Sequence, residues 1–243
     1  MKKLIIANWK MQLNYRDGLG LARKFTNKII KADNEIVVCP DYLILSSLPA
    51  IFKKTGLKLG AQDCASVDRG ACTGEISPLD LKNLGAKYVI LGHSERRQGL
   101  NENSAVINAK IKAALRNDLI PVLCIGENLG QKESGQTKKV LNEELRLSLK
   151  GVKIKTSASL VVAYEPLWAI GTGQPIIPVE AEIMSRFIKD RVAKILGKKV
   201  SIIYGGSVDS ANAAEFLKQK NIGGLLVGNA SLDAPEFNKI SRL

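Results

Sequence analysis

The chain has 243 residues, 45% of them hydrophobic and 24% charged, and it carries a formal net charge of +13. A chain of this length buries a substantial core, as one large domain or two small ones, and its composition is typical of a soluble globular protein. Charged residues interrupt every apolar run well short of the roughly 20 residues of a membrane-spanning helix. The apolar part of the N-terminal segment, residues 4–7, is too short for a signal peptide, so we expect a cytoplasmic protein.

Short apolar runs rich in β-branched residues alternate along the chain with segments whose apolar residues recur at helical spacing. The runs are residues 4–7, 36–39, 57–61, 88–91, 120–125, 160–164, 200–204 and 225–227. The helical segments are residues 19–30, 43–52, 80–84, 105–115, 140–149, 181–195 and 213–217. Pro78 and Pro178 suit the first turn of a helix, and Asp209 with Ser210 suits the start of one at Ala211.

This alternation predicts a parallel sheet, because parallel neighbours need crossover connections. Eight strand–helix units in about 250 residues is the size of a closed (β/α)8 TIM barrel. An open doubly wound sheet is the alternative, but it would place a G-x-G-x-x-G turn after the first strand. The chain has Asn-Trp-Lys-Met-Gln there, at residues 8–12. We therefore predict an α/β fold, a single-domain (β/α)8 barrel over residues 1–243.

Polar residues gather directly after the predicted strands. In a barrel these strand ends converge on one face, where catalytic groups sit. The residues are Asn8, Lys10, Gln62, His93, Glu127 and Glu165, together with glycine-containing turns at residues 205–207 and 228–229. We predict that they form one site.

Glu165 ends an apolar run, and Pro166 keeps it extended, so the acid stands at the last position of a strand. The loop that follows is apolar and contains a tryptophan, and Gly171 and Gly173 give it conformational freedom. A carboxylate beneath a movable apolar lid is a way to hold a base and exclude water. A surface acid before an ordinary loop is the alternative.

His93 is the only histidine, and it follows a buried strand where Ser94 can start a helix. A helix N-terminus disfavours imidazolium, so a neutral His93 can donate a hydrogen bond. Lys10 offers a fixed positive charge to an oxyanion or a phosphate, with Asn8 as a further donor. A structural histidine and a surface lysine are the alternatives.

The glycine-containing turns at Gly171, 205–207 and 228–229 can present backbone N–H groups to an anion. Phosphate sites after the seventh and eighth strands recur in this fold. Turns need glycine in any case, but together with Lys10 and the lid they predict a phosphate site.

The net charge of +13 is compatible with a nucleic acid or a phosphorylated metabolite as partner. The lysines are spread along the helical segments without a basic tail or an RNA-binding signature, which favours a solvated surface and makes nucleic acid an unlikely partner. The four cysteines show no C-x-x-C pair, so we expect neither a metal site nor a disulfide framework. Cys39, Cys64, Cys72 and Cys124 are interpreted as small buried residues, with Cys64 and Cys72 as candidates for oxidation because they fall in a polar loop.

Seven longer motifs follow one another along the chain, at residues 8–11, 70–78, 88–97, 124–127, 163–173, 204–208 and 226–228. In this order they resemble the triosephosphate isomerase family over essentially the whole length. The resemblance implies interconversion of dihydroxyacetone phosphate and D-glyceraldehyde 3-phosphate through an enediolate, without metal or organic cofactor. It also implies a place in glycolysis and gluconeogenesis.

The resemblance further implies a role for each matching residue. Glu165 would move the carbon-bound proton, and His93 would polarise the carbonyl and carry protons between the two oxygens. Lys10 and Asn8 would stabilise the enediolate and bind substrate, with Glu95 in support. The main-chain N–H groups that would hold the phosphate belong to Gly171, Ser207, Gly228 and Asn229. The lid would comprise Pro166, Leu167, Trp168, Ala169, Ile170, Gly171, Thr172, Gly173, Gln174 and Pro175.

A homodimer is implied as well, because the loop with Cys72, Thr73 and Glu75 resembles one that reaches into a neighbouring subunit. Cys72 stands where the family usually has an aromatic ring, which predicts a weaker or redox-sensitive dimer.

Other departures from the family pattern concern the phosphate turn and the lid. Asn229 replaces a usual glycine and can crowd the phosphate, and Leu167 replaces a usual valine at the first lid hinge. Gln174 and Pro175 alter the second hinge, so we expect changed lid kinetics with the chemistry retained.

Two other functions remain open at this point. An aldolase-type barrel enzyme acting on phosphosugars would need a Schiff-base lysine, for which Lys10 is the one well-placed candidate. An inactive barrel that binds anions or nucleic acid would show strongly salt-dependent binding and no turnover.

Overall fold

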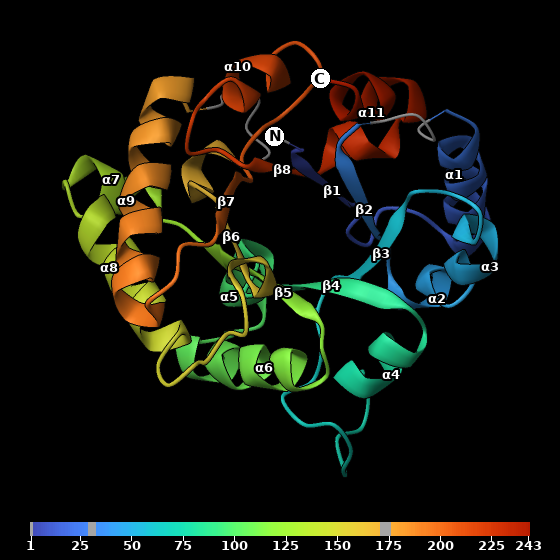
Figure 1. Ribbon diagram of the computed structural model, residues 1–243, viewed down its shortest axis with the longest axis horizontal. Helices are drawn as coiled ribbons and strands as arrows, with labels where there is room; N and C mark the ends of the chain where they lie inside the picture. The colour runs from blue at the N-terminus through green and yellow to red at the C-terminus, as the bar shows by residue number, and fades with distance from the viewer. Residues whose placement is uncertain (1, 29–32, 171–175) are drawn as a thin grey trace.

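The computed structural model describes residues 2–28, 33–170 and 176–243. Eight strands pair in parallel, each with the next along the chain, and β8 pairs with β1 to close a barrel. The strands form the central ring in Figure 1. Their bounds are β1 Leu4–Asn8, β2 Glu35–Cys39, β3 Lys58–Ala61, β4 Ala86–Leu91, β5 Ile120–Ile125, β6 Val161–Tyr164, β7 Ser201–Tyr204 and β8 Gly224–Val227. The predicted (β/α)8 barrel is confirmed.

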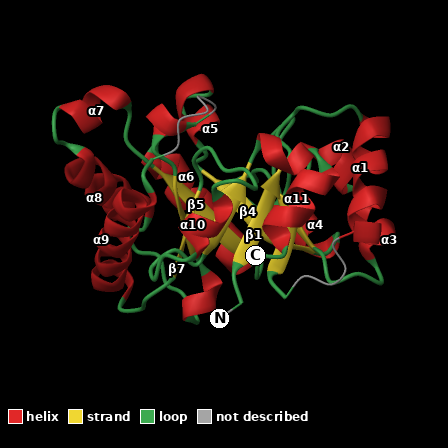
Figure 2. Ribbon diagram, turned by 90° about the horizontal axis from the view of Figure 1, so that it is seen from above, coloured by secondary structure: helices red, strands yellow, loops and turns green. Residues whose placement is uncertain are grey.

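Helices surround the barrel, and the strands lie between them in the side view of Figure 2. The α-helices are α1 Tyr15–Lys28, α2 Tyr42–Leu45, α3 Leu48–Phe52, α4 Pro78–Asn83, α5 Ser94–Gly99, α6 Ser104–Arg116, α7 Leu129–Glu133, α8 Thr137–Ser148, α9 Pro178–Leu196, α10 Ala213–Leu217 and α11 Ala234–Ser241. Three short 3-10 helices complete the described elements: η1 Ser157–Ser159, η2 Leu167–Ala169 and η3 Asn229–Leu232. None of the described helices is long and apolar enough to cross a membrane.

The expected helix over residues 43–52 is wrong in one respect, because this segment forms two helices. Asp41 caps α2 by accepting hydrogen bonds from the N–H groups of Leu43 and Ile44. Pro49 lies in the first turn of α3, where its missing N–H is tolerated but a continuous helix would need it. The helix expected at Ala211 begins two residues later, at Ala213, after a turn that Asp209 closes.

Two apolar layers separate the inside of the barrel from its outside. On β1, Leu4 and Ile6 belong to the inner cluster, whereas Ile5 and Ala7 pack outward against the helices. Successive side chains of a strand point to opposite faces, so the inner row of β1 continues to Asn8. The same alternation on β6, with Ala163 in the inner cluster, turns Glu165 inward. The strand period therefore decides which polar residues enter the site.

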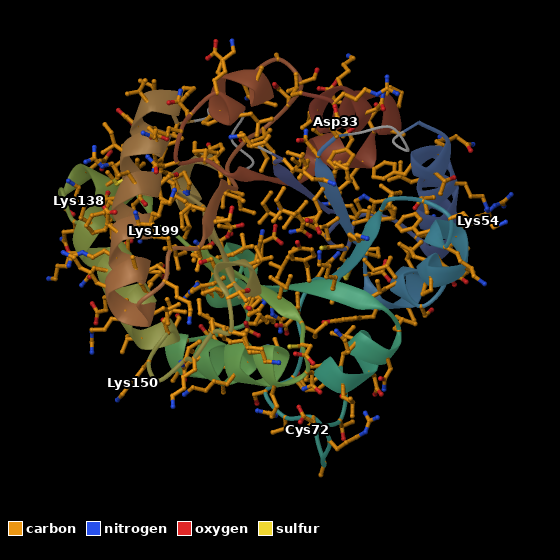
Figure 3. All side chains as sticks on the ribbon, in the orientation of Figure 1. Asp33, Lys54, Cys72, Lys138, Lys150 and Lys199 are labelled. Atoms are coloured by element: carbon orange, nitrogen blue, oxygen red, sulfur yellow. The ribbon has the colours of Figure 1, made fainter. Side chains whose placement is uncertain are left out.

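The cysteines divide into three buried thiols and one exposed thiol. Burial raises the pKa of the Cys64 thiol to about 12, so Cys64 is not the oxidation candidate that its loop position suggested. Cys72 is exposed and lies on the loop between β3 and α4, which projects away from the barrel (Figure 3). The expectation of buried residues holds for Cys39, Cys64 and Cys124.

Candidate active site

A cavity of about 520 Å³ opens at the carboxyl ends of the strands. Its walls include the predicted residues Asn8, Lys10, His93, Glu165, Ser207, Gly228 and Asn229. These residues come from five different strand ends, so the barrel brings together side chains that are up to 221 positions apart in the sequence. Glu95 lines an adjoining cavity of about 210 Å³ together with Lys10 and His93.

Glu165 is buried, with 2% of its surface exposed. Its main-chain N–H donates to Ile125 O at 2.8 Å, which continues the ladder between β5 and β6 beyond the last strand residue. Its carboxylate lies 3.2 Å from the Nε2 atom of His93 through Oε1, and Oε2 accepts from the N–H of Ser94 at 3.2 Å. Two N–H donors thus hold a buried carboxylate at the edge of the cavity.

His93 caps the N-terminus of α5, and its Nδ1 accepts a hydrogen bond from the N–H of Glu95 at 3.3 Å. A ring nitrogen that accepts carries no proton, so this network assigns the proton to Nε2 and leaves the ring neutral. Gly92 has φ of 71°, a left-handed conformation that glycine adopts at no steric cost. That bend interrupts the inward and outward alternation of β4 and lets His93, an out-of-phase residue, face the cavity.

Lys10 has φ of 52°, one of three such non-glycine residues in the described chain. Left-handed backbone at a side-chain-bearing residue costs free energy and is found where the surrounding structure enforces it. Here Gln62 Nε2 donates to Lys10 O at 2.8 Å, and Lys10 Nζ lies 2.6 Å from Glu95 Oε1. Gln62 therefore holds the backbone of Lys10, and Glu95 directs its ammonium group.

The turns after the neighbouring strands β7 and β8 both line the cavity. Both the N–H and the Oγ of Ser207 donate to Ala169 O, at 3.2 and 2.7 Å. The N–H and Oγ of Ser231 donate to Gly228 O, at 2.8 and 2.7 Å, and close the turn in which Gly228 and Asn229 line the cavity. Gly171, the remaining predicted phosphate residue, lies outside the described residues.

Glu127 belongs to the base of the lid and not to the cavity in which it was predicted. It is buried and accepts from Tyr164 OH at 3.1 Å and from Trp168 Nε1 at 2.9 Å. Its backbone O accepts from the N–H of Leu167 at 2.9 Å. Pro166 and Leu167 to Ile170 are described, whereas Thr172, Gly173, Gln174 and Pro175 fall with Gly171 in the segment that is not, so the altered second hinge stays a prediction.

Two acids near the site were missed by the sequence analysis. Glu236 of α11 lines the cavity and accepts from the N–H of Ser210 at 2.7 Å, which ties the turn after β7 to the last helix and lowers the pKa of this carboxyl. Glu144 of α8 accepts from the N–H of Gly126 at 3.0 Å, and burial raises its pKa. Both lie on helices, where a glutamate is common, so no local pattern marks them.

The structure leaves Cys72, Thr73 and Glu75 away from the cavity, exposed on the projecting loop. Asp63, next to Gln62, belongs to a buried ionic cluster. Lys110 Nζ lies 2.6 Å from Asp63 Oδ2, and Arg96 Nη2 lies 2.8 Å from the same atom.

A family model described as triosephosphate isomerase matches residues 3–243. Triosephosphate isomerases from Clostridium tetani and Aquifex aeolicus are 41% and 42% identical to the chain, over 98% and 99% of it and 95% and 98% of their own length. The crystal structure of triosephosphate isomerase from Bartonella henselae superposes with a TM-score of 0.88 at 34% identity, and covers 99% of this chain and 98% of its own. The chain therefore belongs to the triosephosphate isomerase family.

Proposed function

We propose that this protein interconverts dihydroxyacetone phosphate and D-glyceraldehyde 3-phosphate by proton transfer. The observation that carries the proposal is the pair of Glu165 and His93, 3.2 Å apart beside a cavity that also contains Lys10. A buried carboxylate is a base whose oxygens are shielded from water, and a neutral imidazole can donate a hydrogen bond. The family that the chain belongs to supports the same substrate pair.

In the proposed step Glu165 takes the proton from the carbon next to the carbonyl, and the C–H electron pair forms the enediolate. At least one of the two hydrogen bonds to the Glu165 carboxylate has to break before the carboxylate can accept that proton. The Nε2–H of His93 and the ammonium of Lys10 then face the oxygen on which negative charge develops, and Asn8 adds a donor. The hydroxyl proton also has to pass from one oxygen of the enediolate to the other, and His93 Nε2 is the group proposed to carry it. Return of the carbon-bound proton to the neighbouring carbon then completes the isomerisation, so the step needs no external oxidant or reductant.

Phosphate binding is proposed at the turns containing Ser207, Gly228 and Asn229. The N–H of Ser207 donates to Ala169 O, so a phosphate that uses this N–H has to replace a contact to the lid. This exchange links substrate binding to movement of the segment that follows Glu165. Exclusion of water by the lid would protect an enediolate from losing phosphate.

The test compares the wild type with Glu165→Asp and Glu165→Gln in a coupled assay on D-glyceraldehyde 3-phosphate. Aspartate is one methylene shorter, so we expect a loss of about 100-fold or more in kcat, and a larger loss for glutamine, which is not a base. Glu143→Asp and Glu143→Gln, at an exposed position on α8, are the matched controls. Equal activity of all variants would contradict the mechanism.

The aldolase-type alternative is not favoured by the geometry, because Lys10 Nζ forms an ion pair with Glu95. Lys10 would have to break this ion pair before it could form a Schiff base. Borohydride reduction of a mixture with substrate would trap an adduct on Lys10 if that alternative were correct. We expect no added mass on intact protein.

We further propose a homodimer in which the projecting loop with Cys72, Thr73 and Glu75 contacts the neighbouring subunit. Met11, 90% exposed, and Leu100, 61% exposed, border the cavity beside Lys10 and leave an apolar surface for such a contact. Sedimentation should give the mass of two chains, with a tighter dimer for Cys72→Phe. A monomer at micromolar concentration would contradict the proposal.

A cytoplasmic location is also proposed, supported by four free thiols.

A further inference from the structure

A third cavity, of about 380 Å³, lies outside the active site at the outer side of the lid base. It is formed by η2, the turn between α7 and α8, and the first turns of α9, which lie together on one side of the barrel (Figure 1). Its apolar lining comes from Trp168, Ile176, Ile183 and Met184. A cavity of this size is within the range of small-molecule sites in proteins.

Trp168 is the aromatic surface of this cavity and is held in a defined orientation. Its Nε1 donates to Glu127 Oε1 at 2.9 Å, and the hydroxyl of Tyr164 donates to the same carboxylate. Glu127 is only 1% exposed, so its carboxylate is shielded from solvent and accepts hydrogen bonds from these two donors. The fixed indole ring therefore supports the ammonium group of Lys132, which lies over it.

Lys132 and Lys138 line the cavity, together with the acids Glu127 and Glu180. Lys132 Nζ lies 3.4 Å from the centroid of the Trp168 ring, and the nearest carboxylate oxygen recorded for it, on Glu180, is 4.0 Å away. Lys138 points outward at the side of the molecule (Figure 3) and lies 5.9 Å from the ring centroid of Phe187. Among the described residues Lys138 has no carboxylate partner within ion-pair distance.

An apolar lining beside two lysines, one 4.0 Å from its carboxylate partner and the other without one among the described residues, is complementary to a flat apolar group with a negative charge. We propose that this cavity is a binding site for a small aromatic anion, an aromatic carboxylate or sulfonate, whose ring packs on Ile183 and Met184 and whose charge meets Lys138 and the Lys132 ammonium group over the Trp168 ring. Of the described residues to which the proposed function gives a role, the lid residue Trp168 lines this cavity.

The cavity is linked to the active site through the three residues of η2. Trp168 is followed by Ala169, whose O accepts both hydrogen bonds of Ser207, and it follows Glu165 by three positions. A ligand that shifts the indole therefore moves the contact between the lid base and the turn after β7. Occupancy lowers kcat without competing with substrate, and this kinetic part rests on the proposed function, whereas binding does not.

Binding is tested with 8-anilinonaphthalene-1-sulfonate as the probe, by fluorescence titration of the full chain with and without saturating inorganic phosphate. Ile183→Glu places a carboxylate at a half-exposed lining position and should weaken binding at least tenfold. Lys138→Glu should weaken it about fivefold at low salt, since it reverses a charge at the rim. Ile195→Glu and Lys194→Glu, exposed positions near the end of α9, are the matched controls and should change it less than twofold.

Equal probe affinity of Ile183→Glu and the wild type would overturn the site, and displacement by inorganic phosphate would place the probe in the active-site cavity instead. In the isomerase assay the probe should lower kcat of the wild type with KM unchanged, and Ile183→Glu should escape this inhibition. Inhibition that substrate relieves would overturn the link to η2. Loss of isomerase activity without the probe would concern the proposed function alone, because the titration does not use turnover.

Discussion

Gly126 is the position where the structure makes the sharpest prediction about the placement of the proposed base. Gly126 follows β5, and a Cβ atom there would lie 1.7 Å from Glu165 O and 2.5 Å from Glu165 C. It would also lie 3.0 Å from Leu167 Cδ1. The two nearest atoms are backbone, so no side-chain rotation relieves the contact. In Gly126→Ala the separation from Glu165 O has to open from 1.7 Å to at least 3.0 Å.

Two hydrogen bonds flank this contact and resist the movement. The N–H of Glu165 donates to Ile125 O at 2.8 Å, and the N–H of Leu167 donates to Glu127 O at 2.9 Å. The backbone of Glu165 therefore shifts by about 1 Å or gives up one of them, and misplacement on this scale costs roughly 100-fold in rate. Overpacking of this kind costs about 1–3 kcal/mol of stability, and for a chain of this size each kcal/mol lowers Tm by roughly 2–4 °C.

The assay is kcat/KM for D-glyceraldehyde 3-phosphate, measured beside thermal unfolding. Gly205→Ala is a graded comparison, because its Cβ would meet the side chain of Glu165 at 3.0 Å, where a small rotation suffices. Gly20→Ala, inside α1 with no atom within 4 Å of the new Cβ, is the control and should gain about 0.5–1 kcal/mol with unchanged kinetics. A Gly126→Ala enzyme with kcat/KM within twofold of the wild type would refute the reasoning.

Three further predictions concern charge. Lys110→Met leaves Asp63 and Glu102 buried with Arg96 as their shared cation, so unfolding in urea should show a loss of about 3–5 kcal/mol. Burial raises the pKa of Asp63 from 3.8 to about 6, so between these pH values the folded chain binds more protons than the unfolded chain. The free energy of unfolding should therefore fall by up to ~3 kcal/mol as pH rises through this range. Asp63→Asn should abolish the fall, and a variant with the pH profile of the wild type would contradict the assignment to Asp63. Finally, kcat/KM should depend weakly on NaCl above about 0.1 M and more steeply below about 0.01 M, where the Debye length grows to roughly 30 Å. A steep dependence above about 0.1 M would contradict this, and D-glyceraldehyde without phosphate is the uncharged control.

The strands were predictable because each contains a buried apolar run with a polar residue, glycine or proline directly after it. The predicted run at 120–125 coincides with β5, and the other strands differ from their runs by two residues or fewer at each end. The break between α2 and α3 was not predicted, since apolar spacing continues across it, although Pro49 marked it. The helix α11 was not predicted, although Asp233 and Pro235 give it a capping residue and a first-turn proline.

The site was predictable where strand period decides the side-chain direction, as at Asn8 and Glu165. His93 is different, because only the left-handed backbone of Gly92 turns it toward the cavity, and a sequence shows the glycine but not its φ. The role of Gln62, which holds the strained backbone of Lys10, depends on a contact between residues 52 positions apart. No local pattern contains such a contact, so a structure was needed to find it.

The net charge of +13 does not arise at the proposed phosphate site. Of the described residues that line the active-site cavity, Lys10 is the one cation, whereas Glu165, Asp209 and Glu236 are acids. The lysines labelled in Figure 3, such as Lys54, Lys138 and Lys150, stand at the periphery instead. A nucleic acid is bound through many phosphates by a continuous basic surface, whereas one phosphate in a cavity is bound by converging N–H groups. The acids on these walls therefore favour backbone donors for the proposed phosphate site, with Lys10 as the single cation on the described walls.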